Sequence, residues 1–372
     1  MQSKLRSRAS VGQLMIVGFD GTEMSSPMAE LLTRIQPAGV ILFGRNIVNA
    51  QQTHQLLKEC QACVEKPIFS CVDLEGGRVD RFRSVMGPAP SAADVFGSGE
   101  AKLFCRHGEI IGKICCALGF NMDFAPVLDL AFEASRAVMS SRAFSTDPKD
   151  VVRYARGFLR GLKSAGVIGC GKHFPGLGEG DLDSHHDLPV IKKPLAKLWK
   201  EDLVPYRTMK RELPMVLINH ANYPAVTRDK LPASLSKKWI TEVLRRRIGY
   251  RGLIVSDDLE MGGVLKAAPI EQATVDFVRA GGDLCLICHH QEYVERAFEK
   301  LARTAERDLK FRRRVLDSVK RVEAFKRKSP ELRRRAPAPS PEKISRLATQ
   351  LWEFSEQVRL QKLVVASSGA AR

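Results

Sequence analysis

Eight short apolar runs, separated by longer amphipathic stretches, place the strongest constraint on the fold of this 372-residue chain. The runs occupy residues 13–19, 40–43, 67–72, 120–128, 167–170, 215–218, 252–255 and 283–288. Short apolar runs with polar flanks are typical of buried strands, and the stretches between them have helical periodicity. Strands that alternate regularly with helices indicate a parallel α/β sheet, and eight such units predict a (β/α)8 TIM-type barrel.

Local signals also predict where helices begin and end. We expect helices over residues 49–64, 102–118 and 148–165. The last of these has Asp147 and Pro148 at its start, which suit an N-cap and a first-turn proline. Gly166 follows its end, where a left-handed residue commonly terminates a helix.

Polar side chains lie at or just beyond the carboxyl end of every predicted strand. They are Asp20, Arg45, Asp73, Glu75, Asp129, Lys172, His173, Asn219, His220, Asp257, Asp258, His289 and His290. In a closed barrel all eight carboxyl ends meet on one face, where barrel enzymes place their active sites. A doubly wound open sheet, the rival architecture, would gather only the strands next to its switch point and leave most of these residues unexplained.

A glycine-rich segment, KHFPGLGEGDLDSHHDLP, follows the fifth run. Gly176, Gly178 and Gly180 favour sharp backbone turns with positive φ, so we expect a mobile loop here and not the start of a helix. A polar surface loop in which the histidines have no role is the alternative. The length and composition of the segment favour a functional loop.

Within this segment Asp183 lies two residues before His185. A carboxylate at this spacing can orient an imidazole ring and raise its pKa. The pair is therefore a candidate for proton transfer.

The motifs K-H-F-P-G-x-G, D-S-H and L-P in this segment resemble the signature of family 3 glycoside hydrolases. Within that family they are most similar to the single-domain bacterial β-N-acetylglucosaminidases of peptidoglycan recycling. The resemblance extends from about residue 10 to about residue 328. The chain departs from the family at Leu177, where a second histidine is usual, and at His289, where the eighth strand often ends in Cys-Asn.

The resemblance implies the catalytic residues. The motif Ser-Asp-Asp-Leu-Glu-Met at 256–261 matches the family's nucleophile motif, which implies that Asp257 is the nucleophile. His185 is then the acid/base and Asp183 the residue that orients it. Asp258, next to the nucleophile, is predicted to cap the following helix.

The resemblance also implies a set of sugar-binding residues, and these are Asp73, Arg81, Arg142, Lys172 and His173. We interpret Glu75 as structural, as acids at strand ends often are. Asn219 and His220 are weaker site candidates.

The function implied by the resemblance is a retaining exo-β-N-acetylglucosaminidase without metal or cofactor. It would remove GlcNAc from muropeptide-derived GlcNAc-1,6-anhydroMurNAc through a covalent glycosyl-Asp257 intermediate. A family 3 β-glucosidase and an N-acetylglucosaminide phosphorylase remain alternatives. A non-catalytic sugar-binding barrel is a further alternative, but it predicts the loss of Asp257, Asp183 or His185, and all three are present.

The formal charge of +17 raises the question of a nucleic-acid partner. Residues 301–345 hold 15 Lys and Arg against 6 Asp and Glu, but no recognisable nucleic-acid-binding motif. We therefore expect a solvated basic surface and no nucleic-acid partner.

Nine cysteines, without an apolar run suited to a signal peptide or a membrane span, predict reduced thiols in a cytoplasmic protein. We expect the chain to act as a monomer. Two C-x-x-C pairs, Cys60/Cys63 and Cys285/Cys288, are interpreted as core thiols. The second pair lies in a predicted strand, where positions i and i+3 face opposite sides and cannot easily share one metal ion.

Composition divides the chain into three parts. We expect a catalytic barrel over residues 1–328, a basic proline-rich linker over 329–343, and a C-terminal helix and tail over 344–372. The helical periodicity of the last part spans 344–364, so this helix folds back on the barrel or contacts a partner.

Overall fold

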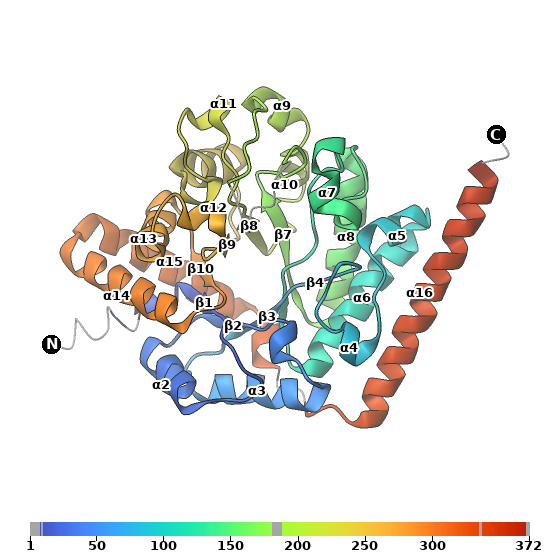
Figure 1. Ribbon diagram of the computed structural model, residues 1–372, viewed down its shortest axis with the longest axis horizontal. Helices are drawn as coiled ribbons and strands as arrows, with labels where there is room; N and C mark the ends of the chain where they lie inside the picture. The colour runs from blue at the N-terminus through green and yellow to red at the C-terminus, as the bar shows by residue number, and fades with distance from the viewer. Residues whose placement is uncertain (1–7, 9, 181–187, 335–336, 370–372) are drawn as a thin grey trace.

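The computed structural model of the protein describes residues 8, 10–180, 188–334 and 337–369. Its core is a closed, parallel eight-stranded barrel in which each predicted run overlaps one strand, in the spatial order β1-β10-β9-β8-β7-β6-β3-β2 (Figure 1). The strands are β1 Met15–Val17, β2 Gly39–Ile41, β3 Phe69–Val72, β6 Met122–Asp123, β7 Ile168–Phe174, β8 Met215–Ile218, β9 Leu253–Asp258 and β10 Leu284–Ile287. A separate antiparallel pair, β4 Leu74–Gly76 and β5 Val79–Asp80, follows β3. The predicted TIM-type barrel is confirmed.

Helices surround the barrel. The α-helices before β8 are α2 Ser26–Ile35, α3 Ala50–Ala62, α4 Arg83–Met86, α5 Ala92–Gly97, α6 Ala101–Leu118, α7 Arg136–Met139, α8 Pro148–Ala165, α9 Leu195–Lys200 and α10 Val204–Thr208. Those after β8 are α11 Pro224–Thr227, α12 Gly262–Leu265, α13 Ile270–Ala280, α14 Gln291–Arg307, α15 Leu309–Lys328 and α16 Pro341–Gly369. The 3-10 turns are η1 Gly44–Asn46, η2 Glu133–Ser135, η3 Ser140–Arg142, η4 Ala233–Leu235 and η6 Pro330–Arg333, and η5 Lys238–Ile248 is a π-helix.

The helix α8 has the predicted boundaries. The Asp147 side chain accepts a hydrogen bond from the Lys149 backbone N–H, and Pro148 occupies the first turn. Gly166 ends the helix with φ of 84°, a conformation that glycine adopts without a steric penalty.

Two strands are longer than predicted. The strand β7 continues to Phe174, which pairs with Ile218 of β8, so Lys172 and His173 belong to the strand and not to the loop. The strand β9 likewise includes Asp257. Polar residues ended the apolar pattern in the sequence, but ion pairs and hydrogen bonds allow them to remain in the strands.

Only one of the three loop glycines has positive φ, so that prediction was partly wrong. Gly176 has φ of 130°, whereas Gly178 and Gly180 do not adopt the left-handed region. Gly178 serves a close approach instead, because a Cβ there would lie 2.7 Å from the Leu130 carbonyl oxygen.

The second cysteine pair has the predicted geometry. Cys285 packs on the outer side of the barrel and Cys288 in its interior cluster, so the two thiols face opposite sides. All nine cysteines are free thiols.

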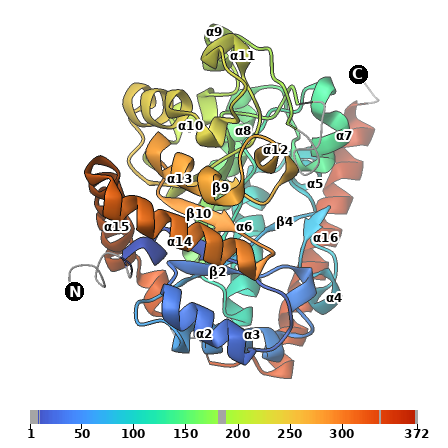
Figure 2. The same ribbon diagram turned by 60° about the vertical axis from the view of Figure 1, so that its left-hand side comes forward.

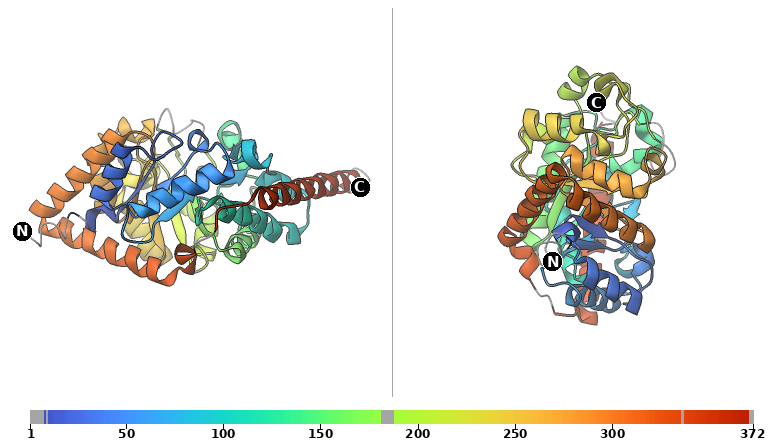
Figure 3. Two further views of the ribbon diagram at one scale, coloured as in Figure 1. Left: turned by 90° about the horizontal axis from the view of Figure 1, so that it is seen from below. Right: turned by 90° about the vertical axis from the view of Figure 1, so that its left-hand side faces the viewer.

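The helix α16 lies against α4, α5 and α6, at the opposite end of the molecule from α14 and α15 (Figures 1, 2 and 3). Leu347, Leu351, Phe354 and Val358 form its buried face. The helix begins at Pro341 and so includes the last residues of the predicted linker. The short turn η6 lies near the start of that linker. The division into three parts stays a prediction. Within the described residues, no helix is long and apolar enough to cross a membrane.

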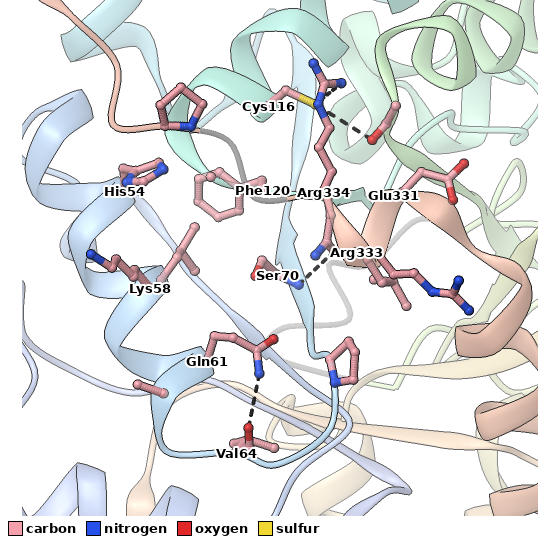
Figure 4. Close-up of a pocket in the computed structure, with 18 of the residues that line it drawn as sticks. His54, Lys58, Gln61, Val64, Ser70, Cys116, Phe120, Glu331, Arg333 and Arg334 are labelled. Carbon is pink, nitrogen blue, oxygen red and sulfur yellow. Dashed lines mark hydrogen bonds between the residues drawn. The ribbon is translucent and has the colours of Figure 1, made fainter.

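A cavity of about 740 Å³ lies on the side of the barrel where the strands begin. Pro67, Asn121 and Gly166 line it, and each stands just before a barrel strand. Figure 4 shows α3 side chains, including Lys58, opposite Arg334 of the segment that leads to α16. The polar carboxyl ends of the strands are on the other side of the barrel.

A buried lysine lies at the same end of the barrel, where the strands begin. Lys326 of α15 donates hydrogen bonds to Gln13 Oε1 (3.2 Å) and to the Ala38 carbonyl oxygen (2.8 Å), and its ammonium lies 5.1 Å from the centre of the Phe69 ring. Burial, with a smaller contribution from Lys66, lowers the pKa of Lys326 to about 7.

This pKa predicts a pH-dependent stability. Between about pH 7 and pH 10.5 the unfolded chain binds more protons at Lys326 than the folded chain, so the free energy of unfolding rises with pH across this window. We expect Lys326→Met to remove about 3–4 kcal/mol of this rise between pH 7 and pH 10, since one pKa unit corresponds to about 1.4 kcal/mol. Urea unfolding at pH 7, 8.5 and 10 measures it. Lys320→Met, on the exposed face of α15, is the control and should keep the wild-type slope.

Candidate active site

The carboxyl ends of β3, β7 and β9 bring polar side chains from distant parts of the sequence together. Lys172 is at the centre of this group, and its side chain is only 3% exposed. Its Nζ lies 2.7 Å from Asp73 Oδ1 and 2.5 Å from Glu75 Oε1. Burial alone would lower the pKa of Lys172, but the two carboxylates outweigh it and raise the pKa. Lys172 is therefore a buried cation held by two anions.

Glu75 also binds Arg142. The Arg142 guanidinium, at the end of η3, donates from Nε to Glu75 Oε2 (2.7 Å) and from Nη2 to Glu75 Oε1 (2.8 Å). Burial would raise the pKa of Glu75, but Arg142 and Lys172 outweigh it and hold the pKa well below its usual range. Glu75 thus joins two predicted sugar-binding cations, which agrees with the structural role inferred for it.

His173 is fixed by two partners. Its Nδ1 lies 2.6 Å from Asp129 Oδ2, and its Nε2 lies 3.2 Å from Arg142 Nη2. A carboxylate accepts and a guanidinium donates, so these partners assign the proton to Nδ1 and leave Nε2 as an acceptor. Asp129 was noted in the sequence only as a strand-end acid, and its role as the partner of His173 was missed. Its position after the run 120–128 was the one available signal.

Asp257 lies in β9 and its side chain is partly exposed. Its Oδ1 accepts a hydrogen bond from the Asp258 backbone N–H (2.9 Å). Burial would raise the pKa of Asp257, but His220, His173 and Lys172 outweigh it and lower the pKa. The residue is therefore a carboxylate at neutral pH.

Asp258 does not cap a helix, so that prediction was wrong. The following helix, α12, begins at Gly262 after Met261. Asp258 Oδ1 instead accepts from the Glu260 backbone N–H (3.1 Å), and Oδ2 lies 3.3 Å from His289 Nε2. The turn between β9 and α12 is longer than the sequence pattern suggested, which moves Asp258 away from the helix start.

Arg81 lies beside an aromatic residue at the same end of the barrel. Its guanidinium is 5.6 Å from the centre of the Phe43 ring, and Arg45 approaches that ring to 4.8 Å. Among the described residues, Arg81 Nε is buried and has no hydrogen-bond partner. A buried donor in this state can bind a polar ligand atom.

The arrangement combines a charged carboxylate at a strand end with buried cations and hydrogen-bonding groups. A carboxylate nucleophile and a second proton-transferring group are the requirements of retaining glycoside hydrolysis. The sequence pattern of the glycosyl hydrolase family 3 N terminal domain matches residues 7–324. The chain belongs to glycoside hydrolase family 3 and is a glycosidase.

Curated relatives and solved structures agree with this family. The chain is 40% identical over 291 residues to a β-hexosaminidase of Alkalilimnicola ehrlichii, a match that covers 76% of this chain and 82% of the relative. A β-hexosaminidase of Bordetella avium is 36% identical over 298 residues, covering 78% and 84%.

Two solved structures of the family are similar along nearly the whole chain. The family 3 β-N-acetylglucosaminidase of Paenibacillus sp. FPU-7 has a TM-score of 0.86 and 32% identity, and the match covers 94% of this chain and 68% of that one. Native NagZ of Neisseria gonorrhoeae has a TM-score of 0.75 and 28% identity, covering 94% and 98%.

In this family 3 enzyme, Asn219 and His220 form hydrogen bonds to the backbone of the strands that carry the site residues. Asn219 Nδ2 donates to the His173 carbonyl oxygen (3.1 Å), and His220 Nε2 lies 2.8 Å from the Asp258 carbonyl oxygen. The other ring nitrogen of His220 lies 2.7 Å from Ser234 Oγ. Both nitrogens of His220 have partners, so this residue holds the end of β9.

The two departures from the family pattern lie in different environments. Leu177 is buried in the apolar core, and its backbone N–H donates to Asp129 Oδ1 (2.7 Å). His289 stacks on Phe43 with ring centres 5.4 Å apart, and its hydrogen bond to Asp258 raises its pKa.

The structure thus brings together Asp73, Lys172, His173 and Arg142. Asp257 lies near them, and His220, His173 and Lys172 together lower its pKa. Asp183 and His185 lie outside the described residues. Within residues 8, 10–180, 188–334 and 337–369 there is no group of three or more His, Cys, Asp or Glu side chains arranged to hold a metal ion.

Proposed function

We propose that this family 3 enzyme is a retaining exo-β-N-acetylglucosaminidase. The observation that carries the proposal is the ionised Asp257 carboxylate at the end of β9, next to a network of buried sugar-binding candidates. Retaining glycosidases use such a carboxylate to form a covalent glycosyl intermediate. Relatives named β-hexosaminidase and β-N-acetylglucosaminidase support GlcNAc as the sugar.

In the first half-reaction, Asp257 attacks the anomeric carbon while the bond to the leaving oxygen breaks. His185 donates its proton to that oxygen, and the aglycone departs as an alcohol. In the second half-reaction, His185 takes a proton from water, and the water oxygen displaces Asp257 from the anomeric carbon. The sugar is released with its original configuration, and Asp183 keeps the His185 ring oriented through both steps.

The sugar hydroxyls would be bound by Asp73, Arg81, Arg142, Lys172 and His173. Asp73 supplies an acceptor, whereas Lys172 and the two arginines supply donors. Glu75 and Asp129 do not need to touch the sugar, because they hold the side chains that do. Fixed donors and acceptors position the anomeric carbon against Asp257 without a cost of reorganisation.

We also propose that the physiological substrate is a muropeptide fragment containing GlcNAc-1,6-anhydroMurNAc, hydrolysed by a cytoplasmic monomer in cell-wall recycling. The positive surface charge suits the anionic lactyl groups of such sugars. Nine free thiols suit a reducing compartment. No nucleic acid, metal or cofactor is part of this proposal.

Hydrolysis of 4-nitrophenyl β-GlcNAc and of the matching β-glucoside tests the proposal, with the initial product anomer followed by NMR. We expect strong preference for GlcNAc and release of the β-anomer first. Preference for the glucoside would indicate a β-glucosidase, and GlcNAc-1-phosphate formed in phosphate buffer would indicate a phosphorylase. The α-anomer would contradict retention, and a folded protein that turns over neither substrate would indicate a sugar-binding barrel.

A further inference from the structure

A buried lysine next to the proposed acid/base segment is surrounded by three carboxylates. The Lys193 side chain is 1% exposed, and its Nζ lies 2.6 Å from Asp202 Oδ2 and 2.6 Å from Glu201 Oε2. The third carboxylate, Glu179, is 3.4 Å away. The ammonium also lies 4.2 Å from the centre of the Phe132 ring. An ammonium buried this deeply stays charged only because anions compensate for its loss of water.

The position of this cluster in the sequence is its important property. Glu179 precedes residues 181–187, which include Asp183 and His185, and Lys193 follows them. Glu201 and Asp202 come from the turn between α9 and α10. Lys193 therefore connects the two ends of the segment to each other and to the body of the barrel.

The first end of the segment is attached to the barrel by further contacts. The Tyr223 hydroxyl donates to the Gly176 carbonyl oxygen (2.7 Å), and the Leu177 N–H donates to Asp129. Gly176 also packs closely on Asp202, since a Cβ at this glycine would lie 2.7 Å from the Asp202 Cβ.

The second end is attached by Asn222. The Asn222 backbone N–H donates to the Pro189 carbonyl oxygen, and its own carbonyl oxygen accepts from the Ile191 N–H, both at 2.8 Å. Each end is thus held separately, and the Lys193–Glu179 ion pair joins one end directly to the other.

We propose that Lys193, through Glu179, Glu201 and Asp202, is a positioning residue that helps to bring His185 within proton-transfer distance of the leaving oxygen. The inference rests on the proposed function, in which His185 is the acid/base. Tying both ends of a segment removes conformations from it, and catalysis depends strongly on how often the reacting groups meet in a productive geometry. Loss of the tie should therefore weaken acid catalysis more than sugar binding.

Leaving-group dependence separates positioning of the acid from general damage. A 2,4-dinitrophenyl leaving group departs without protonation, whereas 4-methylumbelliferyl and methyl β-GlcNAc need it increasingly. We expect Lys193→Met to lower kcat/KM at least 10-fold for methyl β-GlcNAc and less than 3-fold for the dinitrophenyl glycoside, as estimated from the size of general-acid effects. Glu179→Gln, at a partly exposed position, should show the same trend with a smaller amplitude and should fold even if Lys193→Met does not.

Lys197→Met is the matched control. Lys197 also approaches Glu179, at 3.3 Å, but its side chain is 53% exposed and contacts only that one carboxylate of the cluster. This variant should keep wild-type kcat/KM for all three glycosides.

His185→Ala provides the reference for complete loss of acid catalysis. The positioning role is overturned if His185→Ala shows the leaving-group dependence but Lys193→Met and Glu179→Gln do not. In that case kcat/KM of these two variants would fall equally for all three glycosides, or would not fall at all. If His185→Ala itself lacks this dependence, the proposed acid/base is wrong and the inference fails with it. Lys193→Arg keeps the positive charge, and wild-type leaving-group dependence in this variant would support the positioning role.

Discussion

Asp257→Ala should lower kcat/KM for an aryl β-GlcNAc glycoside by about 10⁴-fold or more, the scale seen when a covalent nucleophile is removed. Asp257 is partly exposed and ionised, and its carboxylate accepts a hydrogen bond from the backbone N–H of Asp258. Removing the side chain therefore leaves the polar network of Lys172 intact. Circular dichroism and thermal unfolding should remain close to those of the wild type.

Azide distinguishes a lost nucleophile from a damaged site. The space vacated by the carboxylate admits a small anion, which can attack the anomeric carbon of an activated substrate. We expect azide to restore turnover of the dinitrophenyl glycoside by Asp257→Ala and to yield the α-glycosyl azide. Asp258→Asn is the neighbouring control, since an amide oxygen can still accept from Glu260, and it should lose less than about 10-fold. Near-wild-type hydrolysis by Asp257→Ala would rule out Asp257 as the nucleophile.

Glu75→Gln should lower the free energy of unfolding by about 3 kcal/mol, because it leaves the buried cations Arg142 and Lys172 with too little compensating charge. Activity should fall as well, since both cations are positioned by Glu75. Urea unfolding near pH 7 measures the loss. The Arg156–Glu212 pair offers a matched control, because its two hydrogen bonds have the same lengths, 2.7 and 2.8 Å, in a pair that is 40–42% exposed. Glu212→Gln should cost less than about 1 kcal/mol.

The same substitution has a predictable pH dependence. The pKa of Glu75 is lowered on folding, so its stabilising contribution is present above the pKa of the unfolded carboxyl group and is lost as the pH falls through the folded value. The stability difference between the wild type and Glu75→Gln should therefore be constant near neutrality and shrink below about pH 4, near the ordinary pKa of glutamate. A difference that grows on acidification would contradict the assigned charge of Glu75.

Local patterns were sufficient to predict the barrel. The eight runs, the boundaries of α8 and the polar residues at the strand ends follow from properties of neighbouring residues, namely hydrophobic periodicity, capping and turn preference. The opposed sides of Cys285 and Cys288 follow in the same way from the two-residue period of a strand. Family motifs added the candidate residues of the site.

Local patterns gave the wrong answer, or none, where contacts between residues far apart in the sequence determine the structure. The continuation of β7 through Lys172 and His173 depends on Asp73, Glu75 and Asp129, which compensate for the buried polar groups.

The sequence by itself determined the order of strands and helices, the face on which polar residues gather and the family of the chain. Only the tertiary structure decided which of those residues are partners, as in the pairing of Glu75 with Arg142, 67 residues away, and of Lys193 with Glu179 across the proposed acid/base segment. The physical reason is that periodicity and capping act between near neighbours, whereas the partner of a buried charge is whichever opposite charge the closed barrel brings within hydrogen-bonding distance.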